Sequence, residues 1–287
     1  MTALFGPAGN SQSFQEMGYK KTIQVPEYLS RLGLDIYEYQ CGHGVRISEA
    51  AAKAFGEEAQ KRGILLSVHS PYYISLSSVE AEKRDKSIEY IMQTAAAAHA
   101  MGADRIVIHS GSCAKISRDE ALALAKDTLK RAQHRLDEQG MGEIHLCPET
   151  MGKFNQLGDL EEVLELCSAE ERFLPCIDFG HLNARTLGQV NQPEAFSHIL
   201  YQMENKLGRE RAMQFHSHFS KIEYTEKGGE KRHLTFDDQQ YGPNFEPLGE
   251  LLAERGYTPR VICESAGTQA EDARVMKEIY QGFLNQK

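Results

Sequence analysis

The sequence predicts a single (β/α)₈ barrel, with residues 1–287 forming one domain and a metal site on the face where the strands end. Short apolar, β-branched runs alternate with helical patterns along the chain, which is typical of parallel strands connected by helices. Six of these runs end in histidine or an acidic residue, and the strand ends of such a barrel converge on one face. An open doubly wound sheet would also alternate, but its ligand site usually lies at one switch point.

Eight strands are expected from the apolar runs. They fall near residues 3–7, 34–40, 64–69, 105–109, 143–149, 174–178, 212–217 and 260–264. Helical patterns lie between most of them, at 48–62, 79–101, 118–139, 159–169, 193–207, 244–255 and 270–284. Ser48 followed by Glu49 is a typical helix start. Three long loops, at 40–45, 70–78 and 220–241, are expected on the face that carries the site in such barrels.

The composition is that of an ordinary globular protein, with 41% hydrophobic and 25% charged residues. No apolar run approaches the ~18 residues of a membrane span, and the N-terminal stretch lacks the layout of a signal peptide. We therefore expect a cytoplasmic protein with no membrane partner. The six cysteines are scattered without a CxxC pair, which favours reduced thiols. The net charge of −9 argues mildly against a basic coat for nucleic acid, although a local positive groove remains compatible with it.

The residues that end the six runs are of the types that bind metal ions. The runs LLSVHS, RIVIHS, EIHLCPE, LPCIDFGH, AMQFHSH and RVICES end in His69, His109, Glu149, Asp178 with His181, His216 with His218, and Glu264. Each residue alone has an ordinary alternative, such as a hydrogen-bonded core histidine or a structural salt bridge. Together, at one end of a barrel, they would leave several buried polar groups without partners. We therefore expect a site for divalent cations, zinc in the first place or manganese.

Two features of this set leave its geometry open. His216 and His218 are two residues apart, so a strand would place both on one face, whereas a turn would separate them. His233 lies in the long loop and, taken alone, would be a solvated histidine. A carboxylate such as Glu149 can bridge two cations ~3.5–4 Å apart, the spacing of two-metal hydrolytic sites.

These motifs resemble those of the endonuclease IV family, metal-dependent apurinic/apyrimidinic endonucleases built on a TIM barrel. HSPYYISL, IVIHSGS, PETMGK, CIDFGH, FHSHFS and ICES carry the resemblance, which extends from about Phe5 to Ala266. It implies hydrolysis of the phosphodiester 5′ to an abasic site in damaged double-stranded DNA, with a metal-bridging hydroxide as the nucleophile. It also implies that the protein acts as a monomer.

The resemblance further implies three divalent ions, usually zinc. His69, His109 and Glu149 would hold the first; Glu149 would bridge to a second, also held by Asp178, His216 and Glu264; His181 and His233 would serve the third. Glu149 and Glu264 would be the catalytic carboxylates, which bridge the metals and orient the nucleophile. Tyr72 and Tyr73 could fill the gap where a nucleotide is flipped out of DNA, or could simply pack over the barrel rim.

The chain departs from the family pattern at three places. Lys231 stands where the family has an aspartate for the third metal, and a protonated amine cannot ligate, so Glu230 or His218 would have to substitute or the third site would be weak or empty. The stretch IYEYQCGHG lacks the arginine that enters the DNA base stack, and FGPAG lacks a histidine after the first strand. A basic strip of Lys153, Lys221, Lys227, Lys231 and Arg232 could bind DNA phosphates or be an ordinary solvated loop.

Two other functions fit the same pattern. Barrels similar to xylose isomerase hold divalent metal with histidine and carboxylates at strand ends and act as sugar isomerases or epimerases. The acidic net charge and the missing arginine favour this alternative, whereas the number of histidines favours zinc and hydrolysis. A non-catalytic, decayed metal barrel is supported by Lys231 alone.

Overall fold

Eight parallel strands close into a barrel in this computed structural model, which describes residues 2–113 and 115–286. They are β1 (Leu4–Pro7), β2 (Ile36–Gln40), β3 (Leu65–His69), β4 (Arg105–Ile108), β5 (His145–Pro148), β6 (Cys176–Asp178), β7 (His216–Phe219) and β10 (Arg260–Cys263). Hydrogen bonds order them as β1-β10-β7-β6 and β2-β3-β4-β5. Parallel bridges from Ala8 to Glu38 and from Glu149 to Cys176 join these two groups, so the barrel closes in chain order, as predicted.

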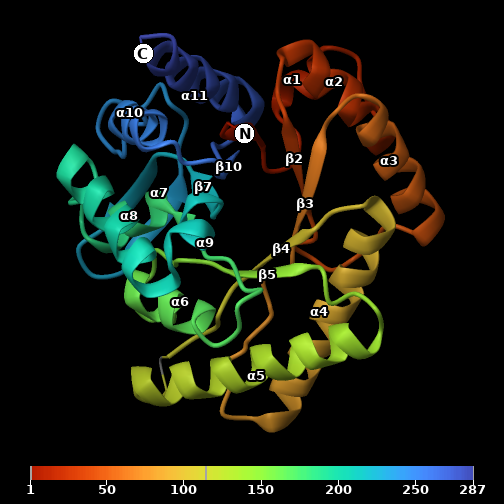
Figure 1. The fold of residues 1–287 in the computed structure, drawn as a ribbon, viewed down its shortest axis with the longest axis vertical. Coiled ribbons are helices and arrows are strands. Elements are labelled where there is room, and N and C mark those ends of the chain that lie inside the picture. Colours follow the sequence, from red (N-terminus) through yellow and green to blue (C-terminus); the bar gives the residue numbers. More distant parts are fainter. Residues whose placement is uncertain (1, 114, 287) are drawn as a thin grey trace.

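Helices surround the barrel, as Figure 1 shows. The expected ones are α3 (Glu49–Lys61), α4 (Ala81–Met101), α5 (Arg118–Glu138), α6 (Leu160–Cys167), α8 (Pro193–Leu207), α10 (Glu246–Arg255) and α11 (Gln269–Leu284). The hydroxyl of Ser48 accepts a hydrogen bond from the Ala51 amide at 3.3 Å, which confirms the predicted cap of α3. None of the helices in the described chain is long and apolar enough to cross a membrane.

Several short helices were not predicted from the sequence. They are α1 (Gln12–Glu16), the 3₁₀ turn η1 (Thr22–Gln24), α2 (Val25–Leu32), α7 (Phe179–Arg185) and α9 (Arg209–Met213). Helix α7 starts directly after β6 because the side chain of Asp178 caps it, accepting a hydrogen bond from the His181 amide at 2.7 Å. The turn that carries both residues is thereby fixed.

The seventh barrel strand lies further along the chain than predicted. The expected range was 212–217, but β7 begins at His216 and ends at Phe219, and part of the expected range belongs to α9. The apolar residues that suggested a strand, Ala212 and Phe215, are fully buried in the main core just before β7 begins. The shift places His216 level with Cys176 of β6, and His218 level with Asp178.

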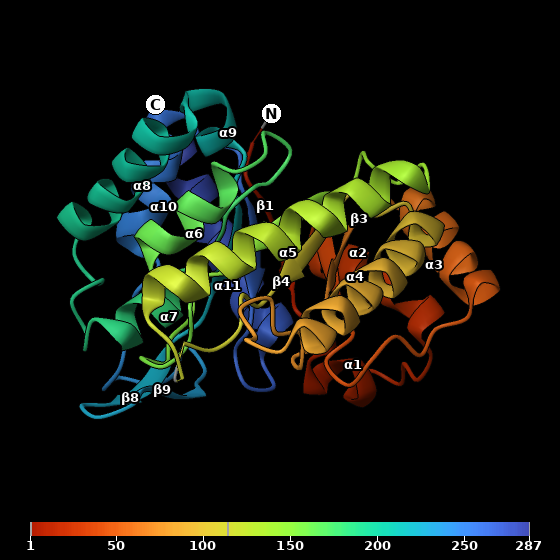
Figure 2. The ribbon, with the colours of Figure 1, turned by 90° about the horizontal axis from the view of Figure 1, so that it is seen from below.

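The segment 220–241, expected to be a loop, contains an antiparallel hairpin. Its strands are β8 (Ile222–Thr225) and β9 (Gly229–His233). Gly229 adopts a positive φ of 73°, which a glycine tolerates at a tight turn. Figure 2 shows the hairpin beside α7, at the end of the molecule away from α9. This hairpin carries Glu230 and His233 to the mouth of the barrel.

The inside of the barrel is apolar in part and polar in part. One small cluster contains Ile36 and Ile262, and another contains Val107, Cys147 and Cys176. Because side chains alternate along a strand, the residue two positions after Ile36, Glu38, also points inward. The six cysteines are free thiols, as expected.

Candidate metal centre

Glu149, directly after β5, lies at the centre of the polar cluster at the strand ends. Its side chain is 1% exposed. Its Oε2 atom is 3.0 Å from Nε2 of His109 and 3.4 Å from Nε2 of His69, and its Oε1 atom is 3.0 Å from Nδ1 of His218. Burial alone would raise the pKa of Glu149, but His218 and His109 hold it well below its usual range. The structure therefore brings His69, His109 and Glu149 together as a first group.

A second group shares Glu149 and adds Asp178, His218 and Glu264. The candidate ligand atoms of these four residues all lie within 4.8 Å of one another. Burial raises the pKa of Asp178 to about 6, and although His181 opposes this shift, Glu264 and Glu149 reinforce it. Atom Oδ2 of Asp178 is buried without a hydrogen bond, although Nδ1 of His181 lies 3.0 Å away. Crowded carboxylates with an unpaired oxygen fit a cation between them.

The third group consists of His181, Glu230 and His233, with Nε2 of His181 3.4 Å from Oε2 of Glu230. The neighbouring Lys231 points the other way and forms an ion pair with Glu223. Glu230 therefore stands where a ligand was missing from the sequence pattern. Of the two substitutes considered for Lys231, the geometry brings Glu230 to this group and His218 to the second group.

Three of the histidines share one mode of support. Atom Nδ1 lies 2.8 Å from the Ser70 carbonyl in His69, 2.9 Å from the Thr150 carbonyl in His181, and 2.8 Å from the Ser220 hydroxyl in His233. A carbonyl can only accept, so Nδ1 of His69 and of His181 donates to it, and Nε2 of each ring faces the ligand groups. Metal-binding histidines are usually oriented in this way.

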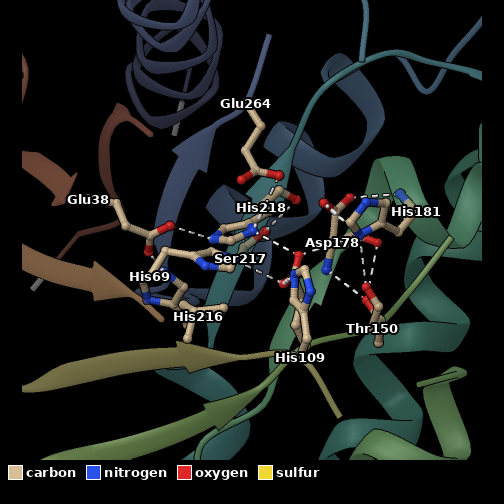
Figure 3. Close-up of polar contacts among 12 residues, drawn as sticks. Glu38, His69, His109, Thr150, Asp178, His181, His216, Ser217, His218 and Glu264 are labelled. Carbon is tan, nitrogen blue, oxygen red and sulfur yellow. Dashed lines mark hydrogen bonds and ion pairs between the residues drawn. The ribbon is translucent and has the colours of Figure 1, made fainter. Parts of the chain in front are cut away.

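His216 does not join Glu149, Asp178 and Glu264, although it was expected to ligate with them. Its Nε2 atom lies 2.9 Å from Oε2 of Glu38, deeper in the barrel (Figure 3). Burial lowers the pKa of His216 to about 4, so the ring is neutral at physiological pH. The geometry thus places His218, and not His216, with Glu149, Asp178 and Glu264. The cause is the position of β7, since the residue taken as the strand end is its first residue.

Glu38 was missed by the sequence analysis. It is fully buried, and both His216 and His218 approach its carboxylate, as Figure 3 shows. The available signal was a single acidic residue within the strand-like run IYEYQ. Sequence alone could not separate an inward-pointing carboxylate from a solvated one at this position.

A hollow of about 320 Å³ opens over the cluster. Tyr72, 53% exposed, lines it, and its ring centroid lies 5.8 Å from that of His109. Tyr73 instead packs edge-on against Tyr90 of α4, with centroids 4.7 Å apart. Of the two tyrosines, Tyr72 is therefore the one that borders the site.

The residues of the expected basic strip have different surroundings. Lys153 lines the hollow, whereas Lys221 is buried and donates to the carbonyls of Phe236 and Asp238. Lys231 and Arg232 both pair with Glu223. Of these four residues, Lys153 is therefore the one that lines the hollow.

The donor atoms of the three groups are imidazole nitrogens and carboxylate oxygens. Such a set fits divalent cations of the zinc or manganese type. Because Glu149 belongs to two of the groups and has two oxygens, the arrangement can hold adjacent cations. It can thus bind and polarise an oxygen-rich substrate and activate water.

Comparison with known proteins agrees with this architecture. An uncharacterized protein of Methanocaldococcus jannaschii is 34% identical over 274 residues, which is 96% of each chain. A protein named probable endonuclease 4, from Mycoplasma pneumoniae, is 29% identical over 192 residues, which is 65% of this chain and 63% of that protein.

Two solved structures show the same fold. Endonuclease IV from Thermus thermophilus aligns with a TM-score of 0.69 at 17% identity, covering 99% of this chain and 100% of that one. A D-tagatose 3-epimerase-like protein aligns with a TM-score of 0.67 at 22% identity, covering 88% and 90%. Residues 26–281 match the sequence profile described as xylose isomerase-like TIM barrel, and the chain belongs to that family.

Proposed function

We propose that this protein is a metal-dependent hydrolase of the endonuclease IV type, which cuts double-stranded DNA on the 5′ side of abasic sites. The observation that carries the proposal is the meeting of three ligand groups around Glu149, Asp178 and His181 at one barrel mouth. A single cation would need only one such group, whereas two or three adjacent cations are typical of phosphodiester hydrolysis. The similarity to proteins named endonuclease 4 supports the same reaction.

Divalent ions held there, with zinc as the first candidate, would supply Lewis-acid activation of water and neutralise charge on the phosphate. Glu149 offers one oxygen to His109 and the other to His218, so it can serve two neighbouring cations. Glu264, with a side chain 17% exposed, borders the hollow and can orient the attacking water by accepting its hydrogen bond. Their positions support the catalytic roles proposed for both carboxylates.

The substrate would be held by groups at the edge of the hollow. The exposed ring of Tyr72 can occupy space left by a displaced nucleotide, and Lys153 can pair with a phosphate. Tyr73 would contribute less, because its ring is packed on Tyr90. One chain supplies all of these residues, which supports action as a monomer. A DNA substrate would also be consistent with the proposed cytoplasmic location.

A sugar isomerase or epimerase is the second candidate. Glu149, Asp178, His218 and Glu264 would suffice for one cation, and the hollow of about 320 Å³ is of a size suited to a small molecule. The fold likeness to a D-tagatose 3-epimerase-like protein favours it as well. A decayed, non-catalytic site is less well supported, because Glu230 compensates for Lys231 in the third group.

The proposal is tested with a duplex oligonucleotide that carries one tetrahydrofuran abasic analogue, which cannot undergo β-elimination. We expect incision on the 5′ side, loss of incision after chelation, and recovery with zinc or manganese. Glu264→Gln should lower incision by several orders of magnitude and keep the fold. Glu138→Gln, at an exposed site on α5, is the matched control. Folded, metal-loaded protein that leaves the duplex intact but epimerises ketoses would establish the second candidate instead.

A further inference from the structure

The carboxylate of Glu38, on β2, is enclosed inside the barrel below the metal centre. Its Oε2 atom accepts hydrogen bonds from Nε2 of His216 at 2.9 Å and from the Ser67 hydroxyl at 3.0 Å. Its Oε1 atom accepts one from the Gln40 amide at 3.2 Å and lies 2.9 Å from Nε2 of His218, off the line of an ideal hydrogen bond. Four donor groups from three strands thus surround two carboxylate oxygens.

A buried carboxylate surrounded in this way is weak evidence of a role in stability alone. Apolar residues of similar volume often stabilise a core at least as well as a buried charge network. Ile36 and Ile262, which lie in the same part of the barrel, show that apolar side chains fit there. The position of Glu38 therefore points to a role beyond filling the interior.

His218 needs the opposite ring orientation from the other histidines of the site. His69 and His181 use Nδ1 for support and turn Nε2 toward the ligand groups. His218 instead turns Nδ1 toward Glu149 at 3.0 Å and Glu264 at 3.4 Å. For Nδ1 to offer a lone pair, Nε2 must carry the proton, and an acceptor must lie beneath it in the barrel. Oε1 of Glu38 occupies that place.

We propose that Glu38 is a positioning residue, which together with His216 fixes the ring and the tautomer of His218 so that Nδ1 faces Glu149 and Glu264. His216 and Ser67 hold the second oxygen, which keeps the carboxylate from rotating away. On β7, His216 therefore holds Glu38, and His218, two residues later, faces the metal centre. This inference rests on the metal centre of the proposed function and not on its DNA substrate.

Glu38→Gln tests the proposal, because an amide presents one acceptor and one donor where two acceptors are needed. We expect cobalt(II) titration of the chelated protein to show one equivalent bound 10- to 100-fold more weakly, the usual effect of losing such an orienting partner. The visible spectrum of that equivalent should change as well. The melting temperature of the metal-free protein, which should fall because the new amide donor faces buried donors, is measured beside it.

A second variant and a control keep the test decisive. Ser67→Ala removes one donor from Oε2 and should weaken the same equivalent by a smaller factor, even if Glu38→Gln does not fold. Glu223→Gln, on β8 of the hairpin, should leave the affinity for that equivalent unchanged. Lower melting temperatures with unaltered cobalt affinity and spectrum would show that Glu38 is only structural and would overturn the proposal. Wild-type protein that binds no cobalt would overturn both the metal centre and this proposal, whereas a failure to cut DNA contradicts the proposed function alone.

Discussion

Glu230 lies beside His181 and His233, where the sequence pattern pointed to Lys231. The motif resemblance placed Lys231 at the third metal, where an ammonium group cannot ligate. The register of the hairpin is irregular between Glu223 and Tyr224, and at this point Lys231 reaches Glu223 while Glu230 reaches His181. The residue of β9 that faces His181 is thus the carboxylate of Glu230, one position before the ammonium group of Lys231.

The first prediction separates these two neighbours. Glu230→Gln should lower the zinc retained after dialysis by up to one equivalent per chain, because it removes the only carboxylate of the His181, Glu230 and His233 group within the described chain. Lys231→Ala should retain the wild-type content, since its ammonium group faces Glu223. Elemental analysis of both variants checks this. Equal zinc content in Glu230→Gln and the wild type would remove Glu230 from the ligand set.

Residues that end an apolar run, such as His69 and Glu149, could be predicted from sequence because a buried polar end needs a partner. The choice between His216 and His218 could not, because both lie on the same face of β7 and only the end of the strand decides. Ala212 and Phe215, which suggested an earlier strand, are buried in the core before β7 begins, so the strand lies later in the chain than its apolar run. Glu38 could not be found either, because it lies within a strand and not at its end.

At the scale of elements, the β8–β9 hairpin is one of the parts that sequence periodicity did not predict. Its charged, glycine-rich sequence is typical of a loop, and its strands are ordered mainly by tertiary contacts. The amide of Glu230 donates to the Gly152 carbonyl at 3.1 Å, which ties the hairpin to the segment after β5. By contrast, the major helices could be placed from their helical patterns, and α3 also from its cap at Ser48.

A second prediction concerns this tie. A Cβ atom at Gly229 would lie 2.2 Å from the Gly152 carbonyl oxygen, and φ is +73° there. Gly229→Ala should push the hairpin outward and weaken zinc binding by His181, Glu230 and His233, with little change in the unfolding of the barrel. Gly228→Ala is the control, because its nearest contact would be the Thr225 hydroxyl at 3.3 Å. Calorimetric zinc titration compares the two variants. Equal zinc affinities would show that the contact between the hairpin and Gly152 does not affect zinc binding.

Three helices around the barrel are connected by ion pairs of one partly exposed glutamate. Glu165 of α6 pairs with Lys126 of α5 and Lys206 of α8. Hydrogen bonds from these two lysines lower the pKa of Glu165 to about 2. A carboxyl group whose folded-state pKa is depressed contributes stability above its unfolded value and loses it as the pH falls toward the folded value.

The third prediction follows from that sign. Glu165→Gln should lower the free energy of unfolding at pH 7 by up to about 1 kcal/mol, because partly exposed pairs are screened by solvent. The difference from the wild type should shrink as the pH falls from about 4.5 toward 2, where Glu165 becomes protonated. Urea unfolding at several pH values measures it. A difference that stays constant over this range would show that the ion pairs are not its source.

At the scale of the whole molecule, the barrel gathers anionic groups at one end of its interior. Glu149, Asp178 and Glu264 come from three strands that are distant in sequence but neighbours or near neighbours around the ring. The barrel fold and this convergence could be predicted because each strand follows the same pattern. The pKa shifts of these carboxylates could not be predicted, because they depend on distances between side chains that only the closed barrel defines.

The fourth prediction follows from that gathering of charge. Metal ions bind the folded site and not the unfolded chain, so saturation should stabilise the protein by about 2.7 kcal/mol per site at a hundredfold excess over the dissociation constant. Chelation should therefore lower the melting temperature by roughly 4–5 °C for one such site in a chain of this length, and added zinc should restore it. Asp178→Asn should reduce this shift, and it should not lower the melting temperature of the chelated protein, because it removes a carboxylate whose pKa burial and Glu264 raise. Calorimetry of the four samples checks both signs. Identical melting of chelated and zinc-loaded wild type would mean that the carboxylates are balanced by the histidines alone and that the cluster is not a metal centre.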